Sequence, residues 1–294
     1  MHSYLRSIGF KDIGQKELEQ IYQETKIAPD RVQEIVDSEG YAFAEIRKEI
    51  LPGIGIAFRG NMDEAGEFVK EYYFPYYIGK YLSTREPVEV IRHSDKESFE
   101  GVCEDLRLGV DLIFHIEDMF YILRSEQRKS RKVDFGGVIL SALGLQGMVI
   151  LPAKKSIKEK VVIEEEKKSR WSLIKAARRG DPEAFEELTL TDMDIYSKIT
   201  RRVEKEDLYS IVTSSFLPSG IETDKYQILA EIMEVILVKN PVTGQMIYIM
   251  TLLCNDMMFG LCINKEDLYG EPLPGRRFKG QIWMQGTVHK EVDS

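Results

Sequence analysis

Histidine and cysteine are scarce in this chain, and nothing in it amounts to an excess of positive charge. Among 294 residues there are 4 His and 3 Cys, and the formal net charge is -9. The cysteines Cys103, Cys254 and Cys262 form no CxxC pair, and an odd, sparse set does not make a disulfide framework. Each lies in an apolar run, so we expect buried thiols in a protein of the reducing cytosol. With so few histidines, no Ser/His/acid or Cys/His motif can be recognised.

The acidic balance argues against nucleic-acid binding, because neutralised phosphates supply most of the affinity of such proteins. The glycine pairs of the chain are not phosphate loops, since no Lys-Ser/Thr pair follows them, and no residue pattern predicts a cofactor. The first residues show no secretory signal. Residues 136–153 are nearly uncharged but rich in glycine, so we predict two buried strands there and no membrane span.

A pattern that occurs twice is the most informative feature that is present. Phe-x-Gly-x-Ile begins at Phe135 and again at Phe278, and each copy is followed by apolar-Gln-Gly-x-Val, starting at Leu145 and Met284. A fixed pattern that recurs within one chain indicates a duplicated supersecondary unit.

The fold that we predict is therefore α+β, with two related halves, each of short helices packed on a mainly antiparallel β-sheet. Residues 1–153 form the N-terminal domain and residues 171–294 the C-terminal domain, whose helices lie in 171–203 before a meander of strands. Between them, residues 154–170 are a run of mixed charges without an apolar face, which predicts a solvated linker or an exposed helix. Asp181-Pro182 predicts a helix start, with Asp as the N-cap.

Short apolar segments of the first half are assigned by their period. Val32, Ile35 and Val36 follow Pro29 at helical spacing, which predicts a short helix. Residues 110–117 and 119–123 read as short antiparallel strands. A dense aromatic run, residues 72–78, contains Pro75, which cannot donate to a sheet ladder and therefore predicts an edge strand or an extended loop.

Asp111, His115 and Glu117 alternate along the predicted strand 110–117 and share one of its faces. Same-face neighbours lie about 6.6 Å apart, so long side chains could converge on one metal ion. Imidazole with two carboxylates suits Zn, Mn or Fe. The alternative is a half-exposed strand whose polar residues simply face water, as antiparallel sheets commonly arrange them.

The aromatic run offers a second candidate site, made of Tyr72, Tyr73, Phe74, Tyr76 and Tyr77. Five rings on a monomer surface would be an unusually large apolar patch. They must therefore pack in the core, bind a ligand or contact another protein. The tyrosine hydroxyls favour a partly wet location, which suggests a contact with a protein partner or within a homodimer.

Residues 1–10 and the closing segments 270–272 and 275–286 resemble an uncharacterised Firmicutes family, catalogued only as a domain of unknown function. Cys254-Asn255-Asp256 and residues 262–265 add to this resemblance, which runs along the whole chain. It implies a bacterial, cytoplasmic protein and carries no activity, cofactor or catalytic residue.

Two functions therefore remain open. The first is a non-enzymatic interaction or scaffold protein that uses the aromatic run as its contact surface. The second is a metal-dependent, hydrolase-like enzyme that uses Asp111, His115 and Glu117.

Overall fold

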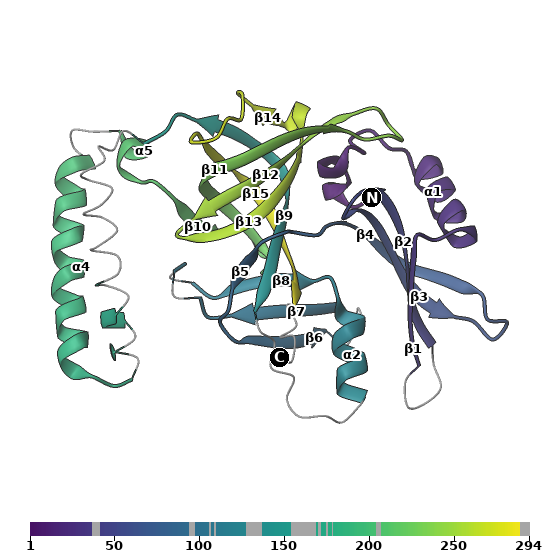
Figure 1. The fold of residues 1–294 in the computed structure, drawn as a ribbon, viewed down its shortest axis with the longest axis horizontal. Helices are drawn as coiled ribbons and strands as arrows, with labels where there is room; N and C mark the ends of the chain where they lie inside the picture. The colour runs from purple at the N-terminus through teal and green to yellow at the C-terminus, as the bar shows by residue number, and fades with distance from the viewer. Residues whose placement is uncertain are drawn as a thin grey trace. The chain divides into compact units, whose positions relative to one another are not determined.

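The structure is a computed structural model of the chain, and it describes residues 1–36, 42–93, 98–105, 107–108, 110–127, 137–153, 169, 172–174, 176–177, 179–203 and 207–288. Strands predominate and helices are few (Figure 1). The chain divides into two compact units, the first made of residues 1–151 and 214–294 and the second of residues 152–213. The chain therefore leaves the first unit after residue 151 and returns to it at residue 214.

One sheet of the first unit is built from the beginning of the chain. Its strands, in spatial order, are β1 (Arg31–Val36), β2 (Ala42–Leu51), β3 (Ile54–Met62) and β4 (Phe68–Tyr77), and all neighbours are antiparallel. Gly53 forms the tight turn between β2 and β3 with a φ of 73°, which glycine adopts without strain. The 3-10 helix η1 (Ser3–Ile8) and α1 (Gln15–Ile27) bury apolar residues in the same core cluster as this sheet.

A larger sheet of eleven strands combines two separate segments of the chain, residues 82–150 and 215–288. Its strands are β5 (Leu82–Thr84), β6 (Val88–His93), β7 (Ser98–Cys103), β8 (Leu112–Ile116), β9 (Val138–Ile150), β10 (Ser215–Pro218), β11 (Lys225–Lys239), β12 (Met246–Cys254), β13 (Met257–Asn264), β14 (Leu268–Tyr269) and β15 (Arg277–Val288). The strand order is β10-β11-β12-β13-β9-β15-β8-β7-β6, and β5 and β14 pair with β9 beside this path. Helix α2 (Met119–Gln127) connects β8 with β9, and the 3-10 helix η2 (Lys265–Asp267) precedes β14.

On each side of the central β9–β15 pair the larger sheet continues with a meander of three strands. Beside β9 lie β13, β12 and β11, and beside β15 lie β8, β7 and β6, so that the last strand of each meander is innermost. Strand β9 follows β6, β7 and β8 in the chain but pairs in parallel with β13, whereas β15 follows β11, β12 and β13 but pairs in parallel with β8. Each long strand thus joins the three-stranded meander of the other segment. Because β11 also pairs with β15, strands β11, β12, β13, β9 and β15 form a closed ring.

The duplicated sequence pattern lies on β9 and β15, which pair antiparallel from Val138–Val288 to Ile150–Arg277. Phe135 and Gly136 lie outside the described residues. The glycines allow aromatic rings to approach the backbone closely. A Cβ at Gly147 would lie 2.3 Å from the Phe278 ring, and a Cβ at Gly286 would lie 2.6 Å from the Phe114 ring.

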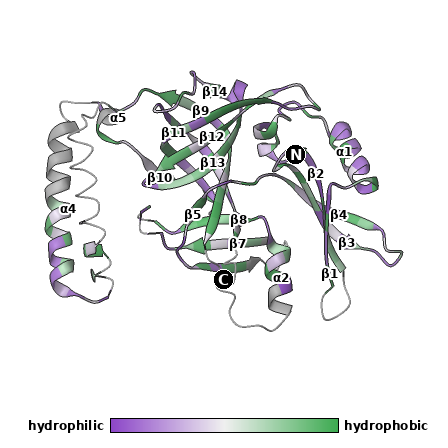
Figure 2. Ribbon diagram, in the orientation of Figure 1, coloured by the Kyte–Doolittle hydropathy of each residue, from purple (hydrophilic) through white to green (hydrophobic). Residues whose placement is uncertain are grey.

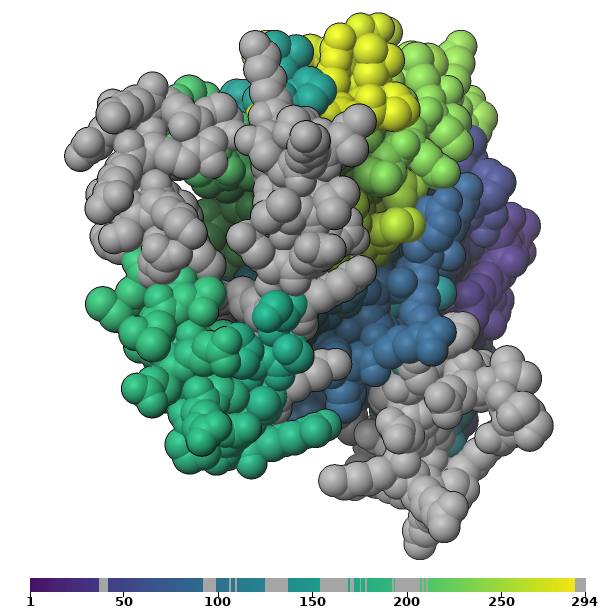
Figure 3. All heavy atoms as spheres, turned by 60° about the vertical axis from the view of Figure 1, so that its left-hand side comes forward, coloured from purple at the N-terminus to yellow at the C-terminus, as the bar shows by residue number. Residues whose placement is uncertain are grey.

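The apolar residues of the first unit form two clusters on opposite sides of the larger sheet. One contains Phe114, Phe259 and Phe278, together with α2. The other joins the four-stranded sheet, η1 and α1 to the second face of the large sheet, to which Leu143, Cys262 and Trp283 contribute. Figure 2 shows hydrophobic residues along these strands and mostly hydrophilic ones on α1. In Figure 3, yellow-green atoms of the last strands border blue atoms of the first segment.

The second unit contains α4 (Pro182–Val203) and the short α5 (Leu208–Ile211). The Asp181 carboxylate accepts hydrogen bonds from the backbone N–H groups of Glu183 and Ala184, at 3.1 and 3.4 Å. The predicted helix start is therefore confirmed. None of the helices that the structure describes is both long and apolar enough to cross a membrane.

Three local predictions were wrong. Residues 31–36 form β1 and not a helix, because their backbone groups pair with β2. Residues 119–123 begin α2 and not a strand, and Val138–Ile150 form one long strand, β9, where we expected two. Short apolar runs fit more than one period, and tertiary pairing decides between them.

The units divide the chain at residues other than the predicted domain boundaries. Strands of residues 225–288 pair with β8 and β9 of the first 153 residues, so these two segments share one sheet. Most of the predicted linker, 154–170, lies outside the described residues.

Candidate functional site

The aromatic run forms β4, an edge strand of the four-stranded sheet, as Pro75 predicted. Edge strands expose backbone groups that natural proteins cover. Here the buried Gln285 of β15 provides the cover, since its side chain donates to the Pro75 carbonyl at 2.9 Å and accepts from the Tyr77 N–H at 3.1 Å. Tyr76 and Tyr77, two of the predicted contact residues, are 2% and 4% exposed and lie in the core. The other three rings line a pocket.

This pocket has a volume of about 730 Å³ and lies between β4 and the larger sheet. Its walls come from the beginning of the chain, from β4, from β8, from the turn before β11 and from β15. Five aromatic side chains line it: Tyr4, Tyr72, Tyr73, Phe74 and Trp283. The Trp283 ring centroid lies 5.6 Å from that of Tyr4 and 6.5 Å from that of Phe74, the latter with an interplanar angle of 87°.

Two histidines stand beside these rings. His2 and His115 both line the pocket, and their ring centroids lie 4.9 and 5.4 Å from that of Trp283. Burial lowers the pKa of His2 to about 4 and that of His115 well below its usual value, so both imidazoles are neutral at pH 7. His2 Nδ1, His115 Nε2 and the Tyr4 hydroxyl are buried and have no hydrogen-bond partner within the protein.

Charged groups complete the lining. Glu71, Glu222, Asp224 and Lys225 are among the pocket residues. Asp224 Oδ2 accepts a hydrogen bond from Trp283 Nε1 at 2.5 Å, and burial raises the pKa of the Asp224 carboxyl to about 6. Lys225 forms an ion pair with Glu222. At pH 7 the lining therefore carries more negative than positive charge.

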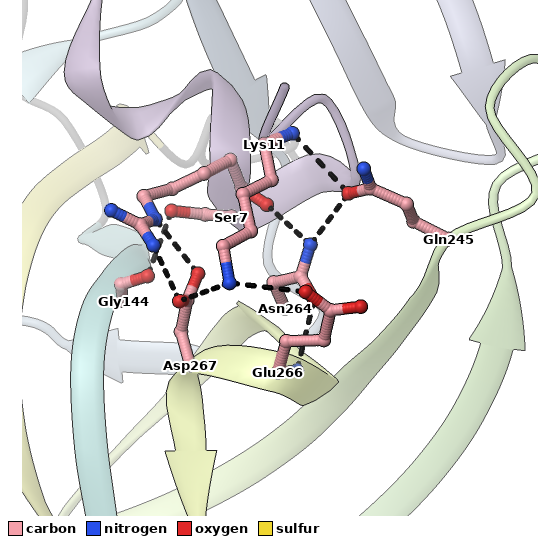
Figure 4. A network of polar contacts seen from close by, with 8 residues as sticks. Ser7, Lys11, Gly144, Gln245, Asn264, Glu266 and Asp267 are labelled. Carbon is pink, nitrogen blue, oxygen red and sulfur yellow. Dashed lines mark hydrogen bonds and ion pairs between the residues drawn. The ribbon is translucent and has the colours of Figure 1, made fainter. Parts of the chain in front are cut away.

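A polar network fixes the segment that carries His2 and Tyr4. Figure 4 shows Asp267, Asn264 and Gln245 facing Ser7 and Lys11 of the N-terminal segment. Arg6 donates two hydrogen bonds to the Asp267 carboxylate, at 2.7 and 2.5 Å. Asn264 donates to the Arg6 carbonyl at 3.2 Å and to the Gln245 side chain at 2.8 Å. Residues near the end of the chain thus position the first wall of the pocket.

Behind the aromatic wall lies a cluster of buried charges. Glu45 accepts hydrogen bonds from Arg47 and Arg59, each at 2.6 Å, and none of the three side chains is more than 4% exposed. The Arg59 guanidinium lies 4.5 Å from the Phe74 ring centroid, on a wall of the pocket. Both guanidiniums also donate to the Glu117 carbonyl, at 2.9 and 3.1 Å. The cluster therefore fixes β2 and β3 against the end of β8.

Glu117 also belongs to this cluster through its side chain. Arg47 Nη1 lies 3.3 Å from Glu117 Oε2, but neither carboxyl oxygen has a hydrogen-bond partner of good geometry. Burial raises the pKa of Glu117 to about 7, against the attraction of Arg47 and Arg59. This carboxyl therefore titrates near neutral pH.

The three residues predicted as metal ligands lie in different environments. Asp111 is exposed and precedes β8, His115 lines the pocket, and Glu117 is buried beside Arg47. Within the part of the chain that the structure describes, no group of three His, Cys, Asp or Glu side chains is arranged to hold a metal ion. The three cysteines are free and buried, as predicted.

A family model covers nearly the whole chain. The family is described as "Domain of unknown function, E. rectale Gene description (DUF3881)", and its model matches residues 5–286. The chain belongs to this family. The resemblance predicted from the sequence is thereby confirmed. No curated protein and no solved structure matches the chain.

Most of the pocket of this DUF3881 member lies inside the matched region, which includes β4, His115, Asp224 and Trp283. Sequence reasoning missed Tyr4, Asp224 and Trp283 as site residues. They are separated by as many as 279 positions in the chain, and no local motif links them. Two signals in the sequence pointed to this site: the aromatic run and His115, which was predicted as a metal ligand and lines the pocket.

Proposed function

We propose that this chain is a binding protein for a small organic molecule, which it holds in the pocket between β4 and the larger sheet. The single observation that carries the proposal is an aromatic-walled hollow whose lining includes buried polar atoms without partners. A volume of about 730 Å³ falls in the range of ligand pockets, which is roughly 300–1,000 Å³.

Buried polar atoms without hydrogen-bond partners support the presence of a bound ligand in this pocket. Buried polar groups in proteins nearly always have a hydrogen-bond partner, and those that lack one require an explanation. Among the described residues, three such atoms belong to pocket-lining side chains: His2 Nδ1, Tyr4 Oη and His115 Nε2. A bound molecule with complementary donors or acceptors would satisfy them.

The aromatic residues take a defined role in this proposal. Tyr72, Tyr73 and Phe74 contact the ligand from β4, while Tyr76 and Tyr77 hold the strand in the core. The Tyr73 hydroxyl accepts a hydrogen bond from the backbone N–H of His2 at 3.1 Å, so the two walls support each other. The interaction expected from the aromatic run is thus proposed to be with a small molecule.

Fluorescence of Trp283 provides the test. The chain contains 2 Trp, and the Trp171→Phe variant leaves Trp283 as the sole reporter. We expect members of a fragment library to change its emission saturably and to raise the melting temperature. A Phe74→Leu variant should weaken binding about fivefold, because a buried ring contact contributes on the order of 1 kcal/mol.

A matched control is Tyr269→Ala, whose ring is 78% exposed and does not line the pocket. It should bind the same fragments as the parent protein. If no fragment of any charge class binds at millimolar concentration, or if Phe74→Leu leaves binding unchanged, the proposed function is wrong.

We further propose that residues 88–150 and 225–288 are two copies of one ancestral unit. The support is the shared order of a three-stranded meander, a crossover and a long strand, and the parallel pairing of each long strand with the other meander. The duplicated sequence pattern on β9 and β15 agrees with this. Superposing β6–β9 on β11–β13 with β15 tests it, and the glycines of the two patterns should then coincide.

A further inference from the structure

We infer that the ligand of this pocket is a small organic cation, held by the aromatic rings and by carboxylates of the lining. This inference rests on the proposed function and adds the charge class of the ligand. It is carried by three independent features of the site: the angles between its rings, its balance of charges and the way its carboxylates are held.

The rings are arranged to present several π faces to one ligand. Trp283 and Phe74 meet at 87°, and Trp283 and Tyr4 at 41°, so a molecule seated against this cluster of rings contacts more than one of them. The face of an aromatic ring is electronegative and attracts cations within about 6 Å of its centroid. The protein already uses this contact, since Lys225 Nζ lies 5.5 Å from the Tyr4 centroid.

The charge balance of the lining favours a positive ligand. Glu71, Glu222 and Asp224 carry carboxyl groups, and Lys225 is the one permanent cation among the lining residues, all of which the structure describes. Lys225 pairs with Glu222, which leaves Glu71 and Asp224 without a cationic partner among the lining residues. Since both imidazoles are neutral at pH 7, they add no positive charge.

The two remaining carboxylates are oriented by neutral donors. Trp283 Nε1 donates to Asp224, and the Asn61 side chain donates to Glu71. A neutral donor fixes the direction of a carboxylate without cancelling its charge, so both groups remain able to attract a cation. An anionic ligand would meet net repulsion here, and a neutral ligand would leave the partly desolvated Asp224 charge uncompensated.

Three molecules of nearly the same shape test the charge class. Choline is the cation, 3,3-dimethylbutan-1-ol is its neutral counterpart and 3,3-dimethylbutanoate is the anion. Binding is measured through Trp283 in the Trp171→Phe protein. We expect choline to bind at least tenfold more tightly than the alcohol at pH 7.5, and the anion to bind most weakly.

Asp224→Asn separates charge from shape, because the amide oxygen can still accept from Trp283. It should weaken choline binding roughly tenfold, as expected for loss of a partly buried charge contact, and leave binding of the alcohol unchanged. Lowering the pH from 7.5 to 5 should weaken choline binding to the parent protein in the same way and have little effect on the variant. Melting temperatures will show whether the parent and the Asp224→Asn variant are both folded.

Glu71→Gln, at an exposed position, provides a second variant in which choline binding should fall.

The outcomes distinguish the two proposals. If the alcohol binds as tightly as choline, or if both carboxylate variants bind choline like the parent, the cation inference is wrong while the pocket remains a binding site. The same conclusion follows if neutral or anionic fragments bind and no cationic one does. Failure of every fragment class instead overturns the proposed function.

Discussion

Glu45 is the shared partner of two fully buried guanidinium groups. Its two carboxylate oxygens each accept a hydrogen bond, one from Arg47 and one from Arg59, and water reaches none of the three side chains to any useful extent. Removing one member of a buried ion pair leaves an uncompensated charge. Glu45 therefore matters mainly because its removal would leave buried guanidinium charges uncompensated and would destabilise the fold.

Glu45→Gln should lower the free energy of unfolding by about 3–5 kcal/mol, since it leaves a buried guanidinium without a counter-charge. Urea denaturation of the purified variant measures this. The control is Glu67→Gln, whose carboxylate pairs with Lys26 and is 63% exposed, and which should leave the denaturation midpoint close to that of the parent. Equal midpoints for the two variants would contradict the buried pairing.

Glu117 leads to a prediction on pH dependence. Its pKa is raised to about 7 in the folded protein, whereas an unfolded glutamate titrates near 4.5. Below pH 4.5 both states are protonated and the residue contributes no pH dependence. As the pH rises from 4.5 to 7 the unfolded state loses its proton first, so stability falls across this window. Above pH 7 the full penalty is present.

Glu117→Gln removes this titration while it keeps the size of the side chain. The stability of the variant relative to the parent should therefore be greater at pH 8 than at pH 5, by about 2–3 kcal/mol from the size of the shift. Denaturation curves at the two pH values provide the measurement. A difference that is independent of pH would show that Glu117 titrates normally.

At the scale of elements, η1 is a short helix whose position depends on residues more than 250 positions away. A 3-10 helix of this length has little stability of its own. Its anchors are the two hydrogen bonds from Arg6 to Asp267 and the bonds of Asn264 and Cys262 to its backbone carbonyls. Because η1 carries the pocket residues Ser3 and Tyr4, these anchors also shape the pocket.

Asp267→Asn should therefore loosen η1 without unfolding the sheets. We expect the amide protons of Leu5, Gly9 and Phe10 to exchange with solvent roughly tenfold faster, as the loss of hydrogen bonds to a charged group implies. Glu266→Gln is the matched control, because the Glu266 carboxylate pairs with Lys11 and its side chain is 65% exposed. Unchanged exchange in Asp267→Asn would show that apolar packing alone holds η1.

Element by element, the sequence predicted what local chemistry determines and missed what tertiary pairing determines. Pro75 placed β4 at a sheet edge, and Asp181-Pro182 marked the start of α4. Val32, Ile35 and Val36 fit a helical period, yet they form β1 because β2 offers an unpaired edge. The pocket could be predicted only in part, since β4 is continuous in sequence while His115, Asp224 and Trp283 meet through strand order alone.

At the scale of the whole molecule, the first unit is assembled from two segments that exchange their long strands. Residues 1–151 supply β9 to one meander, and residues 214–294 supply β15 to the other. The two segments consequently share both apolar clusters. Neither segment holds a complete core of its own.

A protease site inserted between Lys160 and Val161 tests this arrangement. After cleavage the two fragments should elute together in size-exclusion chromatography and separate only in denaturant, because β9 and β15 pair along their whole length. Expressed singly, each fragment should be insoluble or unfolded. Two independently folded fragments would instead support the separate domains expected from the sequence.

The exchange of β9 and β15 also orders events during synthesis on the ribosome. Strand β9 ends at residue 150, and β15 begins only at residue 277. At about 5–20 residues per second, translation of the intervening chain takes roughly 6–25 s. Throughout that interval β8 and β9 lack their shared partner β15 and expose apolar edges, and such non-local pairing is intrinsically slow. The nascent chain is thus most vulnerable to aggregation before β15 is synthesised, and binding by a chaperone would be of most use during that time.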